Sequence, residues 1–523
     1  MVAETAFPPD GILLGPRRMA AADAATIAAG TPGRLLMERA GRAIARAITA
    51  RFAPRPVLVL CGPGNNGGDG WVVARRLAAL GWSVVVASLV DPARLKGDAA
   101  AAFARFGGSW SGELPAGLDG GWLVVDALFG AGLDRPLEGT ARAWVERLAR
   151  HEGPVVAVDV PSGVEGGSGV VLGAAAAADL TVTFCRPKPG HLLLPGRDLV
   201  GELVVADIGI PDALVASVDE GIRRNEPALW AGLLPRRDSA AHKYRFGHAV
   251  VVGGPAHATG ATRLAALAAL RAGAGLVSVA ARPDALPVYA AALTTVMTKP
   301  CADVAGLEAL LADSRLNAWL IGPGAGVGEA TRTVALALAR SGRPLVLDAD
   351  ALTSFADEPA ILFGTLHGAC VLTPHDGEYG RLFTHRGDRL LRARKAAATC
   401  GAVVLLKGAD TVVAAPDGRA AILGAAPAAL ATAGTGDVLA GVILGLLAQG
   451  MPAFEAAAAG AWLHARAGEL VGPGLIAEDL IGRIPAALAF SRGEEVDAKA
   501  AARPSGRAGR LTQAGFRQRF LSG

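Results

Sequence analysis

Short runs of apolar residues alternate with longer amphipathic stretches along most of the chain. In the first half the apolar runs are rich in valine, and they stand at 57–60, 84–89, 123–126, 155–160, 180–184 and 203–208. Apolar runs of this length, separated by helical patterns such as 68–80, are typical of parallel strands buried on both faces. The pattern predicts a doubly wound, Rossmann-like α/β domain.

A second α/β series follows in the other half of the chain. Its apolar runs stand at 249–252, 276–279, 319–321, 345–347, 370–372 and 403–406, and a helical region runs from residue 437 to about 485. No repeat at a fixed period relates the two series, so the sequence predicts two different domains.

The predicted domain boundaries follow from composition. A first domain over 1–212 and a second over 239–490 are separated by a linker at 213–238, where prolines and charge clusters replace any sustained strand pattern. The basic segment 491–523 is predicted to be a disordered tail.

Composition excludes several classes of protein. With 523 residues and 52% hydrophobic residues the chain can bury large cores, yet apolar runs such as 438–448 stop well short of the ~20 residues that cross a bilayer. Arg17 and Arg18 follow the first apolar residues, the reverse of a signal peptide, which favours the cytoplasm.

Cysteine and histidine positions and the net charge argue against a transition-metal protein and a nucleic-acid-binding protein. The five cysteines form no CxxC pair and are predicted to be free and buried, as at Cys61, Cys185 and Cys370. The nine histidines show no metal-ligand spacing, so no transition-metal site is expected. The net charge of +4 is small and its basic bias lies in the tail, so no nucleic-acid partner is expected.

A glycine-rich turn follows the first predicted strand. Gly62, Gly64 and Gly67 have the spacing of a dinucleotide fingerprint, but Asp69 would place a negative charge where a Rossmann domain holds a pyrophosphate. Asn65, Asn66 and Asp69 instead offer oxygens for a cation, a sugar or an amide. The alternative, Asp69 as a simple helix-capping charge, leaves the two asparagines unexplained.

Polar residues also end other strands of the first domain. Asp126 closes the strand at 123–126, and Asp159 closes the strand that begins at 155. Ligands of open α/β sheets bind outside the carboxyl ends of the strands, so these loops should converge into a site. Lys188 follows the strand at 180–184 and is either a cation at the same rim or a solvated loop lysine.

These segments resemble the NAD(P)H-hydrate epimerase domain. The motifs that carry the resemblance are 64–70, 125–133, 159–163 and 188–191, and the match spans about residues 17–210. The resemblance implies that Asn66, Asp126 and Ser162 ligate K⁺. It implies a second set of residues that line the hydrated nicotinamide nucleotide: Asn65, Asn66, Gly67, Gly68, Asp69, Gly130, Ala131, Gly132, Leu133, Asp134, Arg135, Pro136 and Asp159. Asp159 is the candidate acid/base, because epimerisation at the hydrated carbon moves protons there.

The second domain has a small-residue turn before an apolar helix. Gly434, Thr435 and Gly436 let the backbone approach a phosphate closely, and the helix N-terminus favours its negative charge. Asp437 could be an ordinary N-terminal helix charge, worth ~0.3–1 kcal/mol. A carboxylate beside these amides is also the pairing that phosphoryl transfer requires.

The second domain resembles the ribokinase-like superfamily, and within it the ADP-dependent NAD(P)H-hydrate dehydratase. The motifs are 242–248, 259–261, 271–277, 322–326, 348–352, 372–375 and 406–411, over about residues 241–488. The loop at 253–258 departs from the family, which more often has serine or methionine there.

The resemblance also implies roles for residues of the second domain. Residues Ala261, Gly326, His375 and Asp437 would contact the hydrated dinucleotide, and Lys407, Gly408, Ala409, Asp410, Thr411 and Gly436 would hold ADP. His375 has the alternative of a plain turn histidine. The family implies Mg²⁺, phosphate transfer from ADP to the ring hydroxyl with Asp437 as base, and elimination of phosphate.

Together the resemblances imply a bifunctional repair enzyme whose small-molecule substrates are hydrated NAD(P)H and ADP. We expect a homo-oligomer, a state that the sequence itself does not fix. Two rivals remain open. The second domain could be a kinase for a vitamin or sugar hydroxyl with a regulatory first domain, or the chain could be a scaffold that keeps its pockets without turnover.

Overall fold

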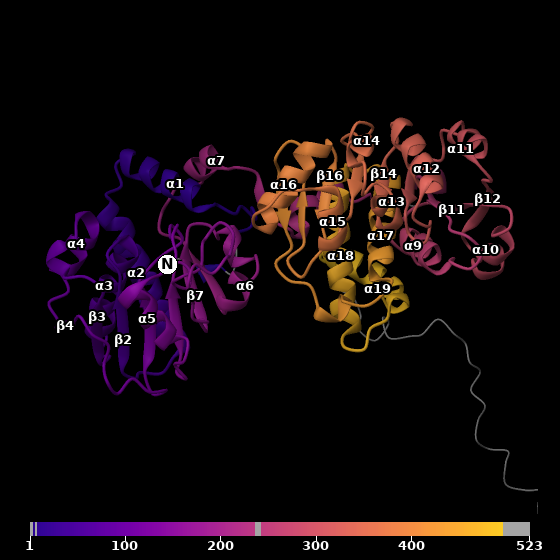
Figure 1. The fold of residues 1–523 in the computed structure, drawn as a ribbon. Coiled ribbons are helices and arrows are strands. Elements are labelled where there is room, and N and C mark those ends of the chain that lie inside the picture. The colour runs from indigo at the N-terminus through magenta and orange to yellow at the C-terminus, as the bar shows by residue number, and fades with distance from the viewer. Residues whose placement is uncertain (1–3, 6–7, 236–241, 495–523) are drawn as a thin grey trace, which may run out of the picture.

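Two twisted sheets, one from each half of the chain, organise the computed structural model, which describes residues 4–5, 8–235 and 242–494 (Figure 1). The two α/β bodies lie side by side, with the first in indigo and magenta and the second running from magenta-pink to yellow. The predicted two-domain α/β architecture is confirmed.

The first sheet has eight strands, and all but β1 run parallel to their neighbours. In spatial order the strands are β1 (Glu4–Thr5), β8 (Glu202–Ala206), β7 (Leu180–Phe184), β6 (Val155–Val158), β5 (Leu123–Ala127), β2 (Val57–Cys61), β3 (Val84–Ser88) and β4 (Trp110–Ser111). The helices are α1 (Pro16–Ala28), α2 (Gly33–Arg51), α3 (Asn65–Ala79), α4 (Gly97–Ala104), α5 (Gly139–Leu148) and α6 (Gly196–Leu199), with 3₁₀ turns η1 (Pro92–Arg94) and η2 (Pro189–His191).

Alternation along the strands explains why both faces of this sheet are covered. In β2, Val57, Val59 and Cys61 join the core formed with α2 and α3. Leu58 and Leu60 point to the other face and pack with α5. Successive side chains of a strand face opposite sides, so an uninterrupted apolar run requires helices on both.

The second sheet has ten strands and is parallel except where β17 joins β16 and β18. In spatial order the strands are β12 (Met297–Pro300), β11 (Leu276–Ala281), β10 (His248–Val252), β13 (Ala318–Ile321), β14 (Leu345–Leu347), β15 (Cys370–Leu372), β16 (Val403–Leu406), β17 (Val412–Ala414), β18 (Ala420–Ile422) and β9 (Ile222–Arg224). The helices are α9 (Gly260–Arg271), α10 (Leu286–Ala292), α11 (Val304–Leu311), α12 (Glu329–Arg340), α13 (Ala349–Thr353), α14 (Pro359–Phe363), α15 (Asp376–Leu382), α16 (Arg389–Cys400), α17 (Thr435–Ala448), α18 (Ala453–Val471) and α19 (Ala477–Ser491), with 3₁₀ turns η4 (Lys243–Phe246) and η5 (Ala428–Leu430).

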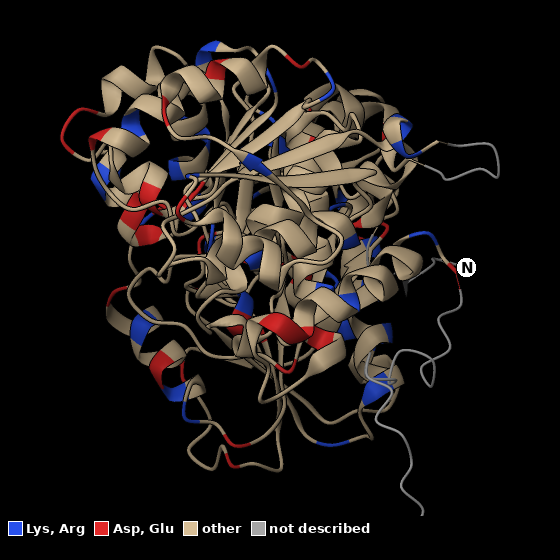
Figure 2. Cartoon of the chain, turned by 90° about the vertical axis from the view of Figure 1, so that its right-hand side faces the viewer, with Lys and Arg blue, Asp and Glu red and all other residues tan. Residues whose placement is uncertain are grey.

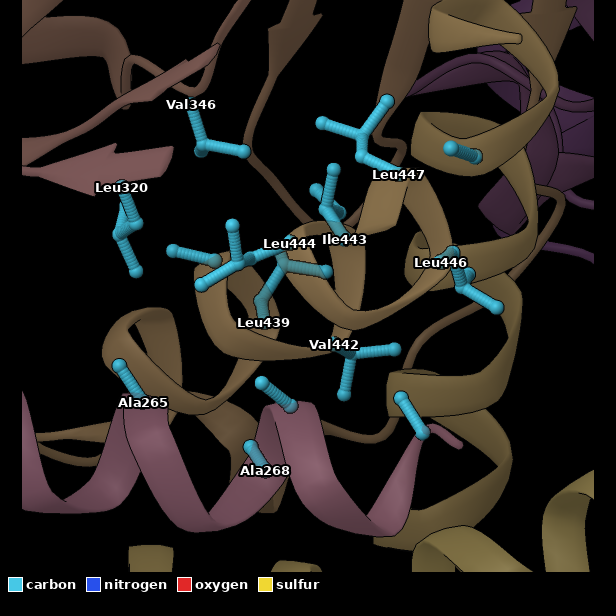
Figure 3. Close-up of a cluster of buried hydrophobic side chains, with 14 of the residues drawn as sticks. Ala265, Ala268, Leu320, Val346, Leu439, Val442, Ile443, Leu444, Leu446 and Leu447 are labelled. Atoms are coloured by element: carbon cyan, nitrogen blue, oxygen red, sulfur yellow. The ribbon is translucent and has the colours of Figure 1, made fainter. Parts of the chain in front are cut away.

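Helix α17 is the centre of the second domain's largest core. Figure 3 shows its leucines and Val442 between α9, which carries Ala265 and Ala268, and the strand residues Leu320 and Val346. The two helices approach closely because α17 has glycine at the contact: a Cβ at Gly441 would lie 2.2 Å from the carbonyl oxygen of Ala265. This packing fixes the N-terminus of α17, where the phosphate cradle is predicted.

The segment predicted to be a linker is largely built into the structure. It contains α7 (Asp212–Val218), β9, α8 (Pro227–Trp230) and η3 (Ala231–Leu233), and β9 pairs in parallel with β18 at the edge of the second sheet. Ile12, near the start of the chain, bridges to Arg223 of β9. The expectation that this segment lacks a strand is therefore wrong, because three residues of β9 are too few to leave a periodic pattern.

Surface charge is mixed, and Figure 2 shows blue and red segments interspersed over peripheral helices and loops while the strands are almost all tan. Among the described residues, no helix is long and apolar enough to span a bilayer. The five cysteines are free, and all but Cys301 are buried, as predicted. Most of the predicted tail, from residue 495 onward, lies outside the described residues, and Ser491 is the last residue of α19.

Candidate functional sites at the carboxyl edges of the two sheets

The glycine-rich turn after β2 packs against the loop after β5. A Cβ at Gly62 would lie 1.8 Å from the carbonyl oxygen of Leu128, and one at Gly67 would lie 2.0 Å from that of Gly62. Only glycine permits this approach, which brings the two strand-end loops together as predicted. Asp69 lies in the second turn of α3, not the first, and burial raises the pKa of its carboxyl well above the usual value, with Asp159 and Asp23 adding repulsion.

Asp159 is held by an array of donors just beyond β6. Lys188 Nζ lies 2.6 Å from its Oδ1, Thr183 Oγ1 donates to Oδ1 at 2.9 Å, and the amide of Ala131 donates to Oδ2 at 2.9 Å. Burial acts to raise the pKa of this carboxyl, but the charge and hydrogen bond of Lys188 outweigh burial and lower it to about 2. Asp159 is therefore a fixed carboxylate at neutral pH.

Lys188 belongs to this site and is not a solvated loop lysine, because its side chain is 2% exposed and also donates to Thr183 Oγ1 at 2.8 Å. His191 supports it: Nδ1 accepts from the Lys188 amide at 2.9 Å, so Nε2 carries the proton and donates to the Asp159 carbonyl at 2.8 Å. Burial, followed by the charge of Lys188, lowers the pKa of His191 to about 4, which keeps the ring neutral.

Asp126 and Ser162 form a second buried cluster beneath the loop at 128–131. Ser162 donates to Asp126 through Oγ at 2.6 Å and through its amide at 2.8 Å, and Ser162 Oγ accepts from the Phe129 amide at 2.9 Å. The Asn66 side chain reaches the same loop, where its Oδ1 would lie 3.0 Å from a Cβ at Gly130. Within the described chain, the buried Asn66 Nδ2 has no hydrogen-bond partner.

Asn66, Asp159 and Lys188 border a cavity of about 530 Å³, whereas Asp126 and Ser162 lie outside its lining. The predicted substrate residues that line it are Asn65, Asn66, Asp69, Gly130, Ala131, Gly132, Leu133, Asp134, Arg135 and Asp159. Gly67 and Gly68 are buried within α3, and Pro136 is exposed outside the lining.

Asp23 of α1 also lines this cavity, and the sequence analysis missed it. Burial raises its pKa to about 6, with Lys188 opposing and Asp159 reinforcing the shift. No strand-end signal marks Asp23, because it comes from a helix that precedes the first long strand.

The second site centres on the turn before α17. Gly434 caps this helix in the left-handed conformation (φ 86°), and a Cβ at Gly436 would lie 3.6 Å from Lys407 Nζ. The amides at the start of α17 and the ammonium group therefore face the same space, which suits an anionic group.

Lys407 follows β16 and is surrounded by carboxylates. Its Nζ lies 2.7 Å from Asp348 Oδ1 and 3.7 Å from Glu378 Oε2. Burial acts to lower the pKa of Lys407, but the two carboxylates outweigh burial and raise it. Neither Asp348 nor Glu378 was among the predicted site residues.

Asp437, in the first turn of α17, is close to other carboxylates and partly removed from water. Burial and the nearby carboxylate of Asp348 raise its pKa to about 7, Lys407 lowers it, and Asp350 adds further repulsion. Asp350 accepts from the amide of Gly326 at 2.9 Å, which brings another predicted residue to this region. The predicted residue Ala261 lies in the first turn of α9, where its Cβ would lie 3.6 Å from a Cβ at Gly324.

His375 caps the N-terminus of α15 and has a structural role. Its Nδ1 accepts from the amides of Gly377 and Glu378, and Glu378 Oε2 accepts from the His375 amide. This reciprocal capping supports the alternative of a turn histidine, and His375 also borders a cavity.

That cavity, of about 490 Å³, lies beside Lys407. The predicted nucleotide residues that line it are Lys407, Gly408, Ala409, Thr411 and Gly436. Asp410 is outside the lining, since its side chain binds Arg389 Nε at 2.8 Å and the Leu194 amide at 3.0 Å. His464, which was not predicted, forms part of the wall, and burial lowers its pKa to about 4.

Comparisons with known proteins match both halves of the chain. Residues 33–190 match the family model described as YjeF-related protein N-terminus, and residues 249–477 match that of NAD(P)H-hydrate dehydratase. A bifunctional NAD(P)H-hydrate repair enzyme of Moorella thermoacetica is 41% identical over 84% of this chain and 88% of its own. That of Escherichia coli (strain K12) is 34% identical over 86% and 88%.

Among solved structures, an ADP/ATP-dependent NAD(P)H-hydrate dehydratase from Bacillus subtilis, co-crystallised with ATP and Mg²⁺, is 30% identical. It covers 49% of this chain and 94% of its own, with a TM-score of 0.44.

Proposed function

This chain belongs to the family of bifunctional NAD(P)H-hydrate repair enzymes, and from that premise we propose how its two sites divide the work. The first domain interconverts the R and S epimers of hydrated NADH and NADPH. The second dehydrates the S form at the expense of ADP and restores NAD(P)H. The observation that carries the proposal is the presence of two separate cavities, each lined by a lysine that is ion-paired to a carboxylate.

Epimerisation requires the carbon–oxygen bond at the hydrated carbon to break and to re-form on the other face, and both events move a proton. We assign the role of proton acceptor to Asp159, whose carboxylate stays ionised beside Lys188 and borders the cavity. Asn65, Asn66 and the loop 130–135 would hold the nucleotide above it.

The side-chain oxygen atoms of Asp126, Ser162 and Asn66 suit a potassium ion. Asp126 Oδ, Ser162 Oγ and Asn66 Oδ1 are hard oxygen ligands. Among the described residues, the buried Asp126 carboxylate (1% exposed) accepts from Ser162 and from the Leu128 amide, and from no lysine or arginine. A K⁺ ion would supply the compensating positive charge there and fix the loop 128–131.

In the second site Asp437 would accept the proton of the substrate hydroxyl while that oxygen attacks the terminal phosphorus of ADP, releasing AMP. Elimination of the phosphate then restores the dihydropyridine ring. Lys407 and the amides at 434–436 would neutralise charge on the moving phosphoryl group.

A magnesium ion fits beside this turn, because Mg²⁺ is usually bound by one or two carboxylates together with phosphate oxygens and water. The carboxylates of Asp348 and Asp350 lie close enough to Asp437 to help raise its pKa, so the three carboxylates share one region. Mg²⁺ would neutralise the phosphates when the nucleotide is bound.

We also infer a cytoplasmic location, which the five free cysteines support, and a homo-oligomeric state, which light scattering of the full chain would measure.

The test is incubation of mixed hydrate epimers with ADP, following AMP release and the near-ultraviolet absorbance of NADH. Asp159→Asn should stop epimer interconversion alone, so that only the S form is consumed, and Asp437→Asn should stop dehydration alone. Glu146→Gln, at the exposed ion pair with Arg142, is the control. Transfer of phosphate to an unrelated vitamin or sugar hydroxyl would favour the kinase alternative, and absence of both activities would favour the scaffold.

A further inference from the structure

One short segment of the first domain reaches both sites. Residues 188–197 begin at Lys188, which binds Asp159, pass through His191, and continue into α6, which contains Arg197. The far end of this segment touches the second domain, so it spans the junction between the domains.

Apolar side chains of this segment pack into the second domain. Leu192 and Leu193 are buried in a core cluster of the second domain that includes Leu406 and Val412, the residues on either side of the loop 407–411. A Cβ at Gly424 would lie 3.2 Å from Leu192 Cδ2, so the loop after β18 rests on the same anchor.

Polar contacts then fix the loop itself. The Leu194 amide donates to Asp410 Oδ2 at 3.0 Å, and Asp410 is 4% exposed. Arg197 Nη1 donates to the carbonyl oxygens of Ala409 at 2.8 Å and Gly424 at 3.2 Å. One guanidinium nitrogen thus joins the loop 407–411 to the segment after β18.

Both segments joined by Arg197 border the nucleotide cavity. Ala409 and Thr411 of the first segment and Leu423 of the second all line it. The Leu423 amide also donates to the Thr411 carbonyl at 2.9 Å, so the two segments form one wall. Fixing this wall in advance removes an ordering cost that nucleotide binding would otherwise meet.

We propose that Arg197 of the first domain is a positioning residue for the ADP site of the second, acting through the carbonyls of Ala409 and Gly424 together with the Leu194–Asp410 hydrogen bond. The dehydratase nucleotide site is then complete only when the epimerase domain is docked. This inference rests on the proposed function, in which the cavity beside Lys407 holds ADP.

The test uses the full chain with Arg197→Ala and Arg197→Lys. Arg197 is 20% exposed and makes its hydrogen bonds to carbonyl oxygens at the surface of the junction, and a melting curve checks that each variant is folded. We expect the Kd and KM for ADP to rise about tenfold in Arg197→Ala, which is the loss of one or two charged hydrogen bonds. The kcat at saturating ADP and the epimerisation rate should stay within about twofold of wild type, because Arg197 touches neither substrate. Arg197→Lys, which keeps the positive charge and a single donor nitrogen, should give a Kd between those of wild type and Arg197→Ala.

Arg394→Ala is the matched control, because Arg394 contacts Glu220 near the same junction, at 3.9 Å, instead of the nucleotide loop. Amide hydrogen exchange should quicken over 408–411 and 423–424 in Arg197→Ala and stay unchanged in Arg394→Ala. A purely structural role of Arg197 would lower the melting temperature without changing the Kd for ADP.

The outcomes separate this inference from the function on which it rests. Lys407→Met reports on the cavity itself: if it binds ADP as wild type does, ADP is elsewhere and both proposals fall. If Lys407→Met loses ADP binding while Arg197→Ala retains it, only the role of Arg197 is overturned. An equal loss of affinity in Arg394→Ala would also overturn that role, since it would reflect loosening of the whole junction.

Discussion

The Nζ atom of Lys407 lies 2.7 Å from Oδ1 of Asp348, and the Asp348 side chain is 2% exposed. Lys407→Met should therefore impair both stability and nucleotide binding. Removing one partner of a buried ion pair leaves an uncompensated charge, which costs about 3 kcal/mol in the free energy of unfolding. Denaturant unfolding and calorimetric titration with ADP measure the two effects.

Lys395→Met is the control for this change, because Lys395 is exposed on α16. We expect it to unfold and to bind ADP as wild type does. Wild-type ADP affinity in Lys407→Met would show that ADP does not bind in the cavity beside Lys407.

The elevated pKa of Asp437 predicts the pH dependence of dehydration. A base must be ionised, and with a pKa of about 7 the rate should rise with pH through neutrality and level off above it. Asp437→Asn should lower kcat by at least about 100-fold above neutrality, and the difference should shrink in acid, where the wild-type carboxyl is protonated. A rate at saturating substrates that is flat from acid to alkaline pH would contradict the role of base.

The raised pKa of Asp437 also predicts that its contribution to folding stability becomes less favourable as pH rises. A folded-state pKa of about 7 lies above the unfolded value near 4, so the native carboxyl retains a proton that the unfolded chain has lost. Asp437 therefore destabilises the fold increasingly as pH rises from about 4 through 7. Asp437→Asn should melt at a higher temperature than wild type in alkaline buffer and gain little in acid.

In the first domain the ion pair of Lys188 and Asp159 has the opposite pH dependence, because it loses stability as pH falls. The pKa of Asp159 is lowered to about 2, so its stabilising contribution is complete above about pH 4 and is lost as pH falls through 2. Lys188→Met leaves burial unopposed by the ammonium group, so the pKa of Asp159 should rise and acid unfolding of this domain should begin at higher pH. Epimerisation should be lost as well, while Lys96→Met, at an exposed lysine, should change neither.

The fold was predictable where the signal is local. Continuous apolar runs such as 57–60 and 403–406 became buried parallel strands, because only helices on both faces satisfy such runs. Asp126 and Asp159 were found because they stand at the ends of such strands, and Lys407 was found through the resemblance carried by the loop after 403–406. Asp348 directly follows the strand at 345–347, but only the tertiary fold shows that it pairs with Lys407. Asp23 and Arg197 have no local signal, because the fold alone brings Asp23 to the first cavity and Arg197 to the second domain.

Replacing Gly434 by alanine should lower the affinity for ADP as well as stability, and a control can separate this effect from backbone strain. Its φ of 86° strains any residue with a Cβ, and that Cβ would also lie 2.9 Å from Leu264 Cδ1 and 3.0 Å from Ala477 Cβ. Gly434→Ala should therefore shift the turn whose amides face Lys407, lowering both the melting temperature and the affinity for ADP. Gly450→Ala is the matched control, because its φ is 90° with nothing within 4 Å of the added Cβ. It should cost about 1 kcal/mol of stability through the same backbone term. Since Gly450 lies beyond the other end of α17, its ADP affinity should remain that of wild type. Equal ADP affinity in the two variants would mean that the turn at Gly434 does not hold the phosphate.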